Sequence, residues 1–143
     1  MSGVGTLVRC VGLGTATGLR STWGLAGPVL TGGAGRGTRA AVIAALIGET
    51  VGDKHPAVPD RLSAMGLAPR LLSGGLGAGT LARRDGAPVL LPSLAGATGA
   101  VVGAVAGRRW RTLAGDRMPD WQAGLVEDVV ALALAVAACR RTG

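Results

Sequence analysis

Two pairs of acidic residues interrupt apolar segments of this chain, and they are its best candidates for chemistry. Glu49 and Asp53 are four residues apart, which places both carboxylates on one face of a helix. Glu127 and Asp128 precede eleven uncharged residues. Because an ionised side chain at the centre of a membrane helix costs about 2.5–3.5 kcal/mol on insertion scales, such acids usually face protein or water and have a partner.

Arginines are the expected partners: Arg20 for one acidic pair, and Arg108 or Arg109 for the other. Such pairs predict an ion or proton pathway, or a polar substrate site between helices. The alternative is that they are ion pairs that only fix helix packing, or acids at helix ends in the headgroup region, which suits Asp53 and Lys54 better. The predicted pathway residues are Arg20, Glu49, Asp53, Lys54, Arg108, Glu127 and Asp128.

The composition favours a membrane environment for the elements that position these charges. The chain has an apolar fraction of 48% and a mean hydropathy of +0.44, yet it contains 26 Gly, three Trp, and neither Phe nor Tyr. A water-soluble core of this length normally buries aromatic side chains. In a bilayer, by contrast, small residues allow helix backbones to approach closely. We therefore expect a lipid bilayer around the protein.

The clearest predicted helix is the uncharged segment Gly86–Gly107, whose 22 residues suffice to cross a bilayer. Gly99, Gly103 and Gly107 recur every four residues, so they form one close-packing face, through which we expect the chain to associate with itself as a homo-oligomer. The other apolar segments are shorter or contain charges: 10–35, 40–52, 71–82 and 121–139.

Together these segments predict an all-α fold in which residues 1–143 form one integral membrane domain of four to five short Gly/Ala-rich helices. Counting basic residues on alternate sides gives eight against six, a weak bias toward an N-terminus on the inside. The predicted location is a bacterial plasma membrane, crossed several times. Similar orders of glycine, arginine and glutamate around Arg20–Glu49 and Arg108–Glu127 also suggest an internal inverted repeat.

Several classes of function are disfavoured by the sequence. The formal charge of +7 is spread over the polar connections, and the lack of aromatics to stack on bases argues against a nucleic-acid partner. Cys10 and Cys139 provide neither a disulfide framework nor a metal site. No catalytic set can be assembled from chain neighbours, so we predict no enzyme activity, cofactor or metal.

The sequence resembles a group of bacterial membrane proteins classed under the domain of unknown function 4126, from about residue 12 to 138. The resemblance rests on Gly18-Leu19-Arg20-Ser21, Gly48-Glu49 with Asp53-Lys54, Pro56 and Pro59, Arg70 with Ser73-Gly74 and Gly77-Ala78, and Leu125 with Glu127-Asp128. It implies a compact protein that crosses the membrane several times, and it implies no reaction. The absence of Phe and Tyr departs from the more aromatic composition expected of that family.

Two hypotheses follow for function. The first is a transporter or channel-like protein for a small solute or ion, with Arg20, Glu49 and Glu127 lining a central polar site. The second is a non-transporting structural or accessory membrane protein whose buried charges lock the helices together. A membrane enzyme that acts on a lipid through the acids is a third, less favoured interpretation.

Overall fold

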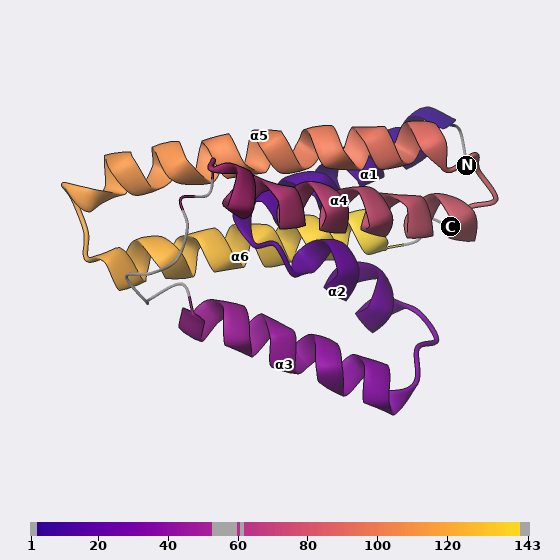
Figure 1. Ribbon diagram of the computed structural model, residues 1–143, viewed down its shortest axis with the longest axis horizontal. Coiled ribbons are helices and arrows are strands. Elements are labelled where there is room, and N and C mark those ends of the chain that lie inside the picture. The colour runs from indigo at the N-terminus through magenta and orange to yellow at the C-terminus, as the bar shows by residue number, and fades with distance from the viewer. Residues whose placement is uncertain (1–2, 53–59, 61, 141–143) are drawn as a thin grey trace.

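The protein is all-α in the computed structural model, which describes residues 3–52, 60 and 62–140 (Figure 1). The chain runs back and forth along the long axis of the bundle, and α1 begins at the same end of the bundle at which α6 finishes. The described residues form six helices: α1 (Gly3–Leu19), α2 (Trp23–Thr31), α3 (Arg36–Gly52), α4 (Ala64–Arg84), α5 (Leu90–Gly115) and α6 (Asp120–Cys139).

The sixth helix arises because the apolar segment 10–35 is two helices. α1 ends at Leu19, and α2 begins at Trp23 after a short turn that contains Ser21 and Thr22. The Thr22 side chain does not cap α2; the hydroxyls of Ser21 and Thr22 donate to Glu49 instead. The hydropathy pattern alone did not predict this break, so the predicted number of four to five helices is too low for the described residues.

The bounds of α5 also differ from those of the helix predicted at Gly86–Gly107. Gly86 has a φ of 67° and lies in the turn after α4, where the N–H of Ala87 donates to the carbonyl of Ala82, 2.9 Å away. This geometry ends α4 with a left-handed glycine. α5 therefore begins four residues later, at Leu90, and continues past the predicted end to Gly115.

The direction of the helices contradicts the predicted inverted repeat. That repeat matched α1 to α5 and required them to run in opposite directions. A Cβ added to Gly14 would touch Gly96, and one added to Gly18 would touch Ala100, so residue numbers rise together along the contact. α1 and α5 are therefore parallel. The extra break before α2 is the reason, because it reverses the direction of every later helix relative to the five-helix count.

The core is formed by α1, α4, α5 and α6, with the most extensive contact between α1 and α5. It is packed with small residues: most of its fully buried apolar side chains are alanines. Gly99 and Gly103 lie against the backbone of α1, at Val11 and Thr15 respectively, and Gly107 is buried on the same helix. The glycine face expected to join two copies is thus used inside the chain.

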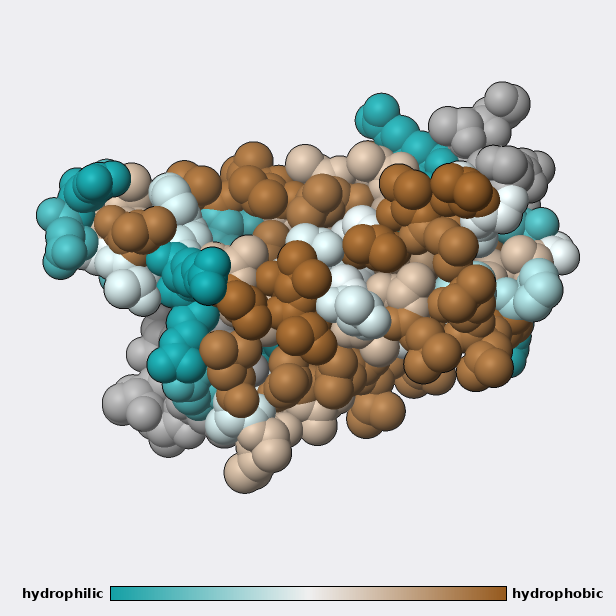
Figure 2. Space-filling model, turned by 90° about the horizontal axis from the view of Figure 1, so that it is seen from above, coloured by the Kyte–Doolittle hydropathy of each residue, from teal (hydrophilic) through white to brown (hydrophobic). Residues whose placement is uncertain are grey.

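Large apolar side chains lie on the outside of the bundle instead, where they form an apolar belt. Leu72, Leu76, Leu94 and Val102 are each more than half exposed. Figure 2 shows this apolar surface occupying the middle of the molecule, with hydrophilic residues gathered toward its ends. Among the helices of the described residues, α5 and α6 are by length and composition long and apolar enough to cross a membrane.

The distribution of arginines between the two ends differs from the predicted one at Arg9. Arg9 forms an ion pair with Asp85 at 2.7 Å, which places it at the end of the bundle where α4 finishes, beside Arg83 and Arg84. The sequence count had placed it on the opposite side. The count of eight against six therefore misassigned Arg9, because it treated residues 10–35 as a single segment.

Candidate functional site

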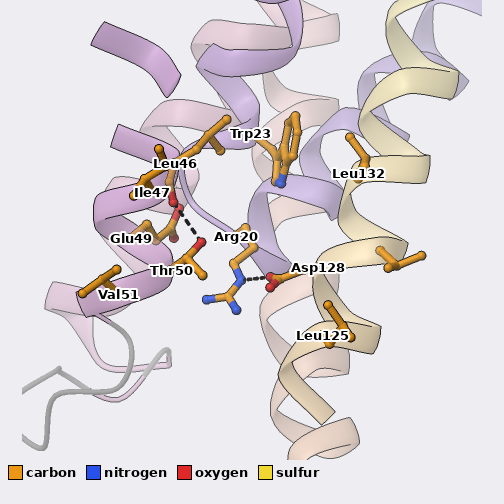
Figure 3. Close-up of a pocket in the computed structure, with 11 residues that line it drawn as sticks. Arg20, Trp23, Leu46, Ile47, Glu49, Thr50, Val51, Leu125, Asp128 and Leu132 are labelled. Carbon is orange, nitrogen blue, oxygen red and sulfur yellow. Dashed lines mark hydrogen bonds and ion pairs between the residues drawn. The ribbon is translucent and has the colours of Figure 1, made fainter. Parts of the chain in front are cut away.

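A cavity of about 440 Å³ between α3 and α6 brings together three of the predicted charges (Figure 3). Arg20 from the end of α1, Glu49 from α3 and Asp128 from α6 all line it. Its remaining walls are mostly apolar and include Trp23 and Leu132. We call this cavity the α3–α6 groove. Residues far apart in sequence thus share one surface because α3 folds back toward α6.

Arg20 and Asp128 form an ion pair across the groove. Arg20 follows the last residue of α1, and its backbone N–H still donates to Ala16 at 2.9 Å, so the end of the helix sets the position of its side chain. Arg20 is buried, whereas the Asp128 side chain is one-third exposed. In Figure 3 the guanidinium of Arg20 extends into the gap between the two helices. This is the arginine–acid pairing predicted for one of the two acidic pairs.

Glu49 binds the beginning of α2 through a set of hydrogen bonds. Its Oε1 accepts from the backbone N–H and the hydroxyl of Ser21, at 2.7 and 2.6 Å. Its Oε2 accepts from the N–H of Thr22 at 3.0 Å and from the Thr22 hydroxyl. A helix begins with unpaired N–H groups and a partial positive charge, which a carboxylate satisfies. Glu49 therefore tethers α3 to the start of α2.

Glu127 pairs with Arg111, which the sequence did not predict, whereas Arg108 pairs with Asp60. Arg111 Nε donates to Glu127 Oε2 at 2.8 Å, and Arg111 Nη1 donates to Asp120 Oδ1 at 2.7 Å. Arg108 lies 3.5 Å from Asp60, with both side chains more than half exposed. The prediction chose the wrong arginine because it considered charge without helical phase.

The sequence did contain a signal for Arg111. It lies four residues beyond Gly107, so it continues the row that starts at Gly99 and stays on the buried face of α5. Arg108 falls on the outer face. The glycine spacing would have identified the inward-facing arginine had it been extended by one more turn.

A second cavity, of about 360 Å³, continues the groove toward the start of α6. It shares Arg20, Thr50 and Asp128 with the first cavity and adds Arg111, Asp120 and Trp121. Glu127 does not line either cavity; it lies beside Trp110 in an apolar recess between α1, α5 and α6. Glu127 therefore does not join Arg20 and Glu49 in one polar site.

Other arginines bind the carboxyl ends of helices. Arg70 donates to Gly18 near the end of α1 at 3.2 Å, and Arg9 donates to Ala138 near the end of α6 at 2.7 Å. Arg84 donates to Pro28 of α2. Cations at these positions satisfy carbonyl groups that have no partner within the helix. These contacts are structural, and they show that buried charge in this protein often serves to join helices.

Asp53 and Lys54 of the predicted pathway lie outside the described residues. Within the described part of the chain, no group of histidine, cysteine or acidic side chains could hold a metal ion, and both cysteines are buried free thiols. No protein-family profile, curated protein or solved structure matches this chain.

Proposed function

We propose that the chain is an integral protein of a bacterial plasma membrane and crosses it several times. The inside-out distribution of side chains supports this, because small residues fill the core and large apolar residues face outward. A water-soluble protein rarely exposes a continuous apolar surface of this kind. α5 and α6 provide two candidate spans. Because α1 and α4 pack in the same bundle as α5 and α6, we expect them to cross the membrane as well.

Within this membrane protein, the α3–α6 groove binds a small solute or ion on its way across the membrane. One observation carries this proposal: Arg20, Glu49 and Asp128, from three helices, line a single cavity. Charges of both signs at the edge of an apolar belt are costly unless they are paired or functional. Here Arg20 is paired with Asp128 and Glu49 binds the start of α2, yet all three also border open space, which a purely structural lock does not require.

The second candidate function is a non-transporting membrane protein whose charges lock helix packing. It is favoured by the number of charges with partners in the chain itself: Arg111 with Glu127 and Asp120, Arg9 with Asp85, and Glu49 with the start of α2. Removing one member of such a buried pair destabilises the fold without any effect on transport.

Proton flux in proteoliposomes separates the two. The wild-type chain should raise the flux, measured with a pH-sensitive dye, above that of empty vesicles. Glu49→Gln should abolish this increase and leave the amount and size of the reconstituted protein unchanged. Asp116→Asn is the matched control, because Asp116 is exposed in the connection between α5 and α6 and lines neither cavity of the groove.

Two results would contradict transport through the groove. One is a wild-type flux equal to that of empty vesicles for protons and, in a second assay, for potassium ions. The other is a Glu49→Gln protein that aggregates while the Asp116→Asn protein does not, which would favour the packing role.

We also propose self-association and the family resemblance on separate grounds. The glycines of α3 offer an open face, since a Cβ added to Gly37, Gly48 or Gly52 would meet nothing within 4 Å. Close approach of a second copy would use them. The resemblance to the family classed under domain of unknown function 4126 rests on the sequence motifs around Arg20, Glu49 and Arg70.

A further inference from the structure

The α3–α6 groove combines two surfaces that one type of molecule would satisfy together. Its inner part is apolar, with Trp23, Leu46 and Leu132 among its walls. Its outer part, toward the start of α6, is lined by Arg111 and Asp120, close to Trp121. The two cavities share Arg20 and Asp128 and so form one continuous groove. A long apolar surface that ends in charges of both signs matches an amphiphile.

We propose that this groove binds a phospholipid with a zwitterionic headgroup that carries a primary amine, as in phosphatidylethanolamine. An acyl chain lies between α3 and α6, and the headgroup lies among Arg20, Arg111, Asp120 and Asp128. The proposal rests on the membrane location proposed above but not on transport. It concerns a lipid of the surrounding bilayer, distinct from the solute or ion proposed above, and follows from the arrangement of the charges in the groove.

The charges discriminate among headgroups. Guanidinium groups bind phosphate oxygens through paired hydrogen bonds, which suits Arg20 and Arg111. Carboxylates accept hydrogen bonds from an ammonium group, and Asp120 has free capacity because its side chain is 88% exposed. A choline group has no N–H to donate, and its recognition uses several aromatic rings around the cation. Among the described residues that line this end of the groove, Trp121 is the only aromatic side chain.

An anionic lipid fits less well. Three carboxylates, those of Glu49, Asp120 and Asp128, line the two cavities, against two guanidinium groups. The local balance therefore opposes a headgroup with net negative charge. Trp121 also places this end of the groove at headgroup depth, because it is 63% exposed at the first turn of α6, as is usual for tryptophans at membrane interfaces.

The three tryptophans of the chain allow a direct test in reconstituted vesicles. The double variant Trp110→Phe/Trp121→Phe retains Trp23 in the groove, and Trp23→Phe/Trp121→Phe retains Trp110 in the separate recess beside Ala106 and Leu134. Vesicles of phosphatidylcholine are supplemented with acyl-brominated phosphatidylethanolamine, phosphatidylcholine or phosphatidylglycerol. Bromine quenches a tryptophan that it contacts, so the mole fraction for half-maximal quenching reports occupancy.

For Trp23, the mole fraction of brominated phosphatidylethanolamine that gives half-maximal quenching should be about tenfold lower than that of either other lipid. The reason is that one charge-assisted hydrogen bond changes affinity by about tenfold. Trp110 should show no such preference. Asp120→Asn should remove the preference at Trp23, and Asp116→Asn should keep it. Asp120 is exposed, so its substitution leaves folding intact.

Equal quenching of Trp23 by the three lipids would overturn the proposal, and so would an unchanged preference in Asp120→Asn. Stronger quenching by brominated phosphatidylglycerol would identify an anionic ligand instead and would also overturn it. If the protein is not an integral membrane protein, the result is different: alkaline carbonate would release the chain from membranes, and no tryptophan would be quenched.

Discussion

The packed bundle and α3 use the same residue types in opposite ways. In the bundle, glycines lie where two backbones meet: a Cβ at Gly18 would be 2.2 Å from the carbonyl oxygen of Ala100, and one at Gly103 would be 2.1 Å from that of Thr15. On α3, Gly48 meets nothing within 4 Å. α3 has no buried residue and packs substantially only against α2.

The comparison shows that composition does not distinguish a helix that builds the core from one held at its surface. α3 is rich in alanine and glycine like α5, but its position depends on a few polar contacts. The hydrogen bonds of Glu49 to Ser21 and Thr22 connect it to α2, and cavities separate it from α6. The fold therefore has a rigid part and a tethered part, which are expected to respond differently to substitution.

The largest expected difference is between Gly103→Leu and Gly48→Leu. A side chain at Gly103 would force α1 and α5 apart, and overpacking of this kind costs roughly 3 kcal/mol or more. We expect Gly103→Leu to yield little folded protein in detergent, whereas Gly48→Leu should elute like the wild type in size-exclusion chromatography. Equal loss of folded protein in both variants would show that α3 is packed as tightly as the bundle.

A second, smaller difference is expected between two arginines. Arg20 is buried against Asp128, so Arg20→Met should destabilise the protein by about 3 kcal/mol, at the low end for a broken buried pair because Asp128 is one-third exposed. Arg108→Met removes an exposed pair with Asp60 and should cost less than about 1 kcal/mol. Thermal unfolding midpoints in detergent provide the measurement.

The double variant Arg20→Met/Asp128→Leu sharpens this test. Because both members of this pair are then removed, neither leaves the other unpaired, and part of the lost stability should return. A double variant less stable than Arg20→Met alone would mean that Asp128 has other stabilising contacts, and that the pair is not the main interaction at this position.

The smallest expected effect is local. Glu49→Gln retains a hydrogen-bonding side chain but removes the negative charge beside the start of α2. The attraction between that charge and the start of the helix contributes about 1 kcal/mol to stability. Amide hydrogens of α3 should exchange faster with solvent, while those of α5 should be unchanged. Thr50→Val is the control, since the Thr50 hydroxyl donates only within α3, to Leu46 at 2.9 Å. Faster exchange throughout the bundle would show that α3 is integral to the core.

Much of the fold follows from the sequence because its local signals are strong. Runs of alanine, leucine and valine between charged residues predicted helices at five places, and helices are found at all of them. The turn at Arg20–Thr22 was missed, because two short apolar helices joined by three residues have the hydropathy of one long segment. That omission produced the low helix count and the inverted repeat, since both depend on the direction of each helix.

The candidate site was predicted less completely. The sequence identified Arg20, Glu49 and Asp128 as costly charges, and they line one groove. It did not identify Ser21 and Thr22 as partners of Glu49, because backbone N–H groups become binding groups only where a helix begins. It also grouped Glu127 with the others, although adjacent residues on a helix point about 100° apart, so Glu127 and Asp128 face different cavities.

The sequence by itself determined that this chain is helical, that its helices approach closely through small residues, and that the few charges within its apolar segments need partners. These properties depend on residue type and local spacing. Only the tertiary structure decided which partners those charges have: Asp128 for Arg20, Arg111 for Glu127, and the start of α2 for Glu49. The reason is physical, because pairing depends on helix direction and rotation, and both are set by the packing of backbones distant in sequence.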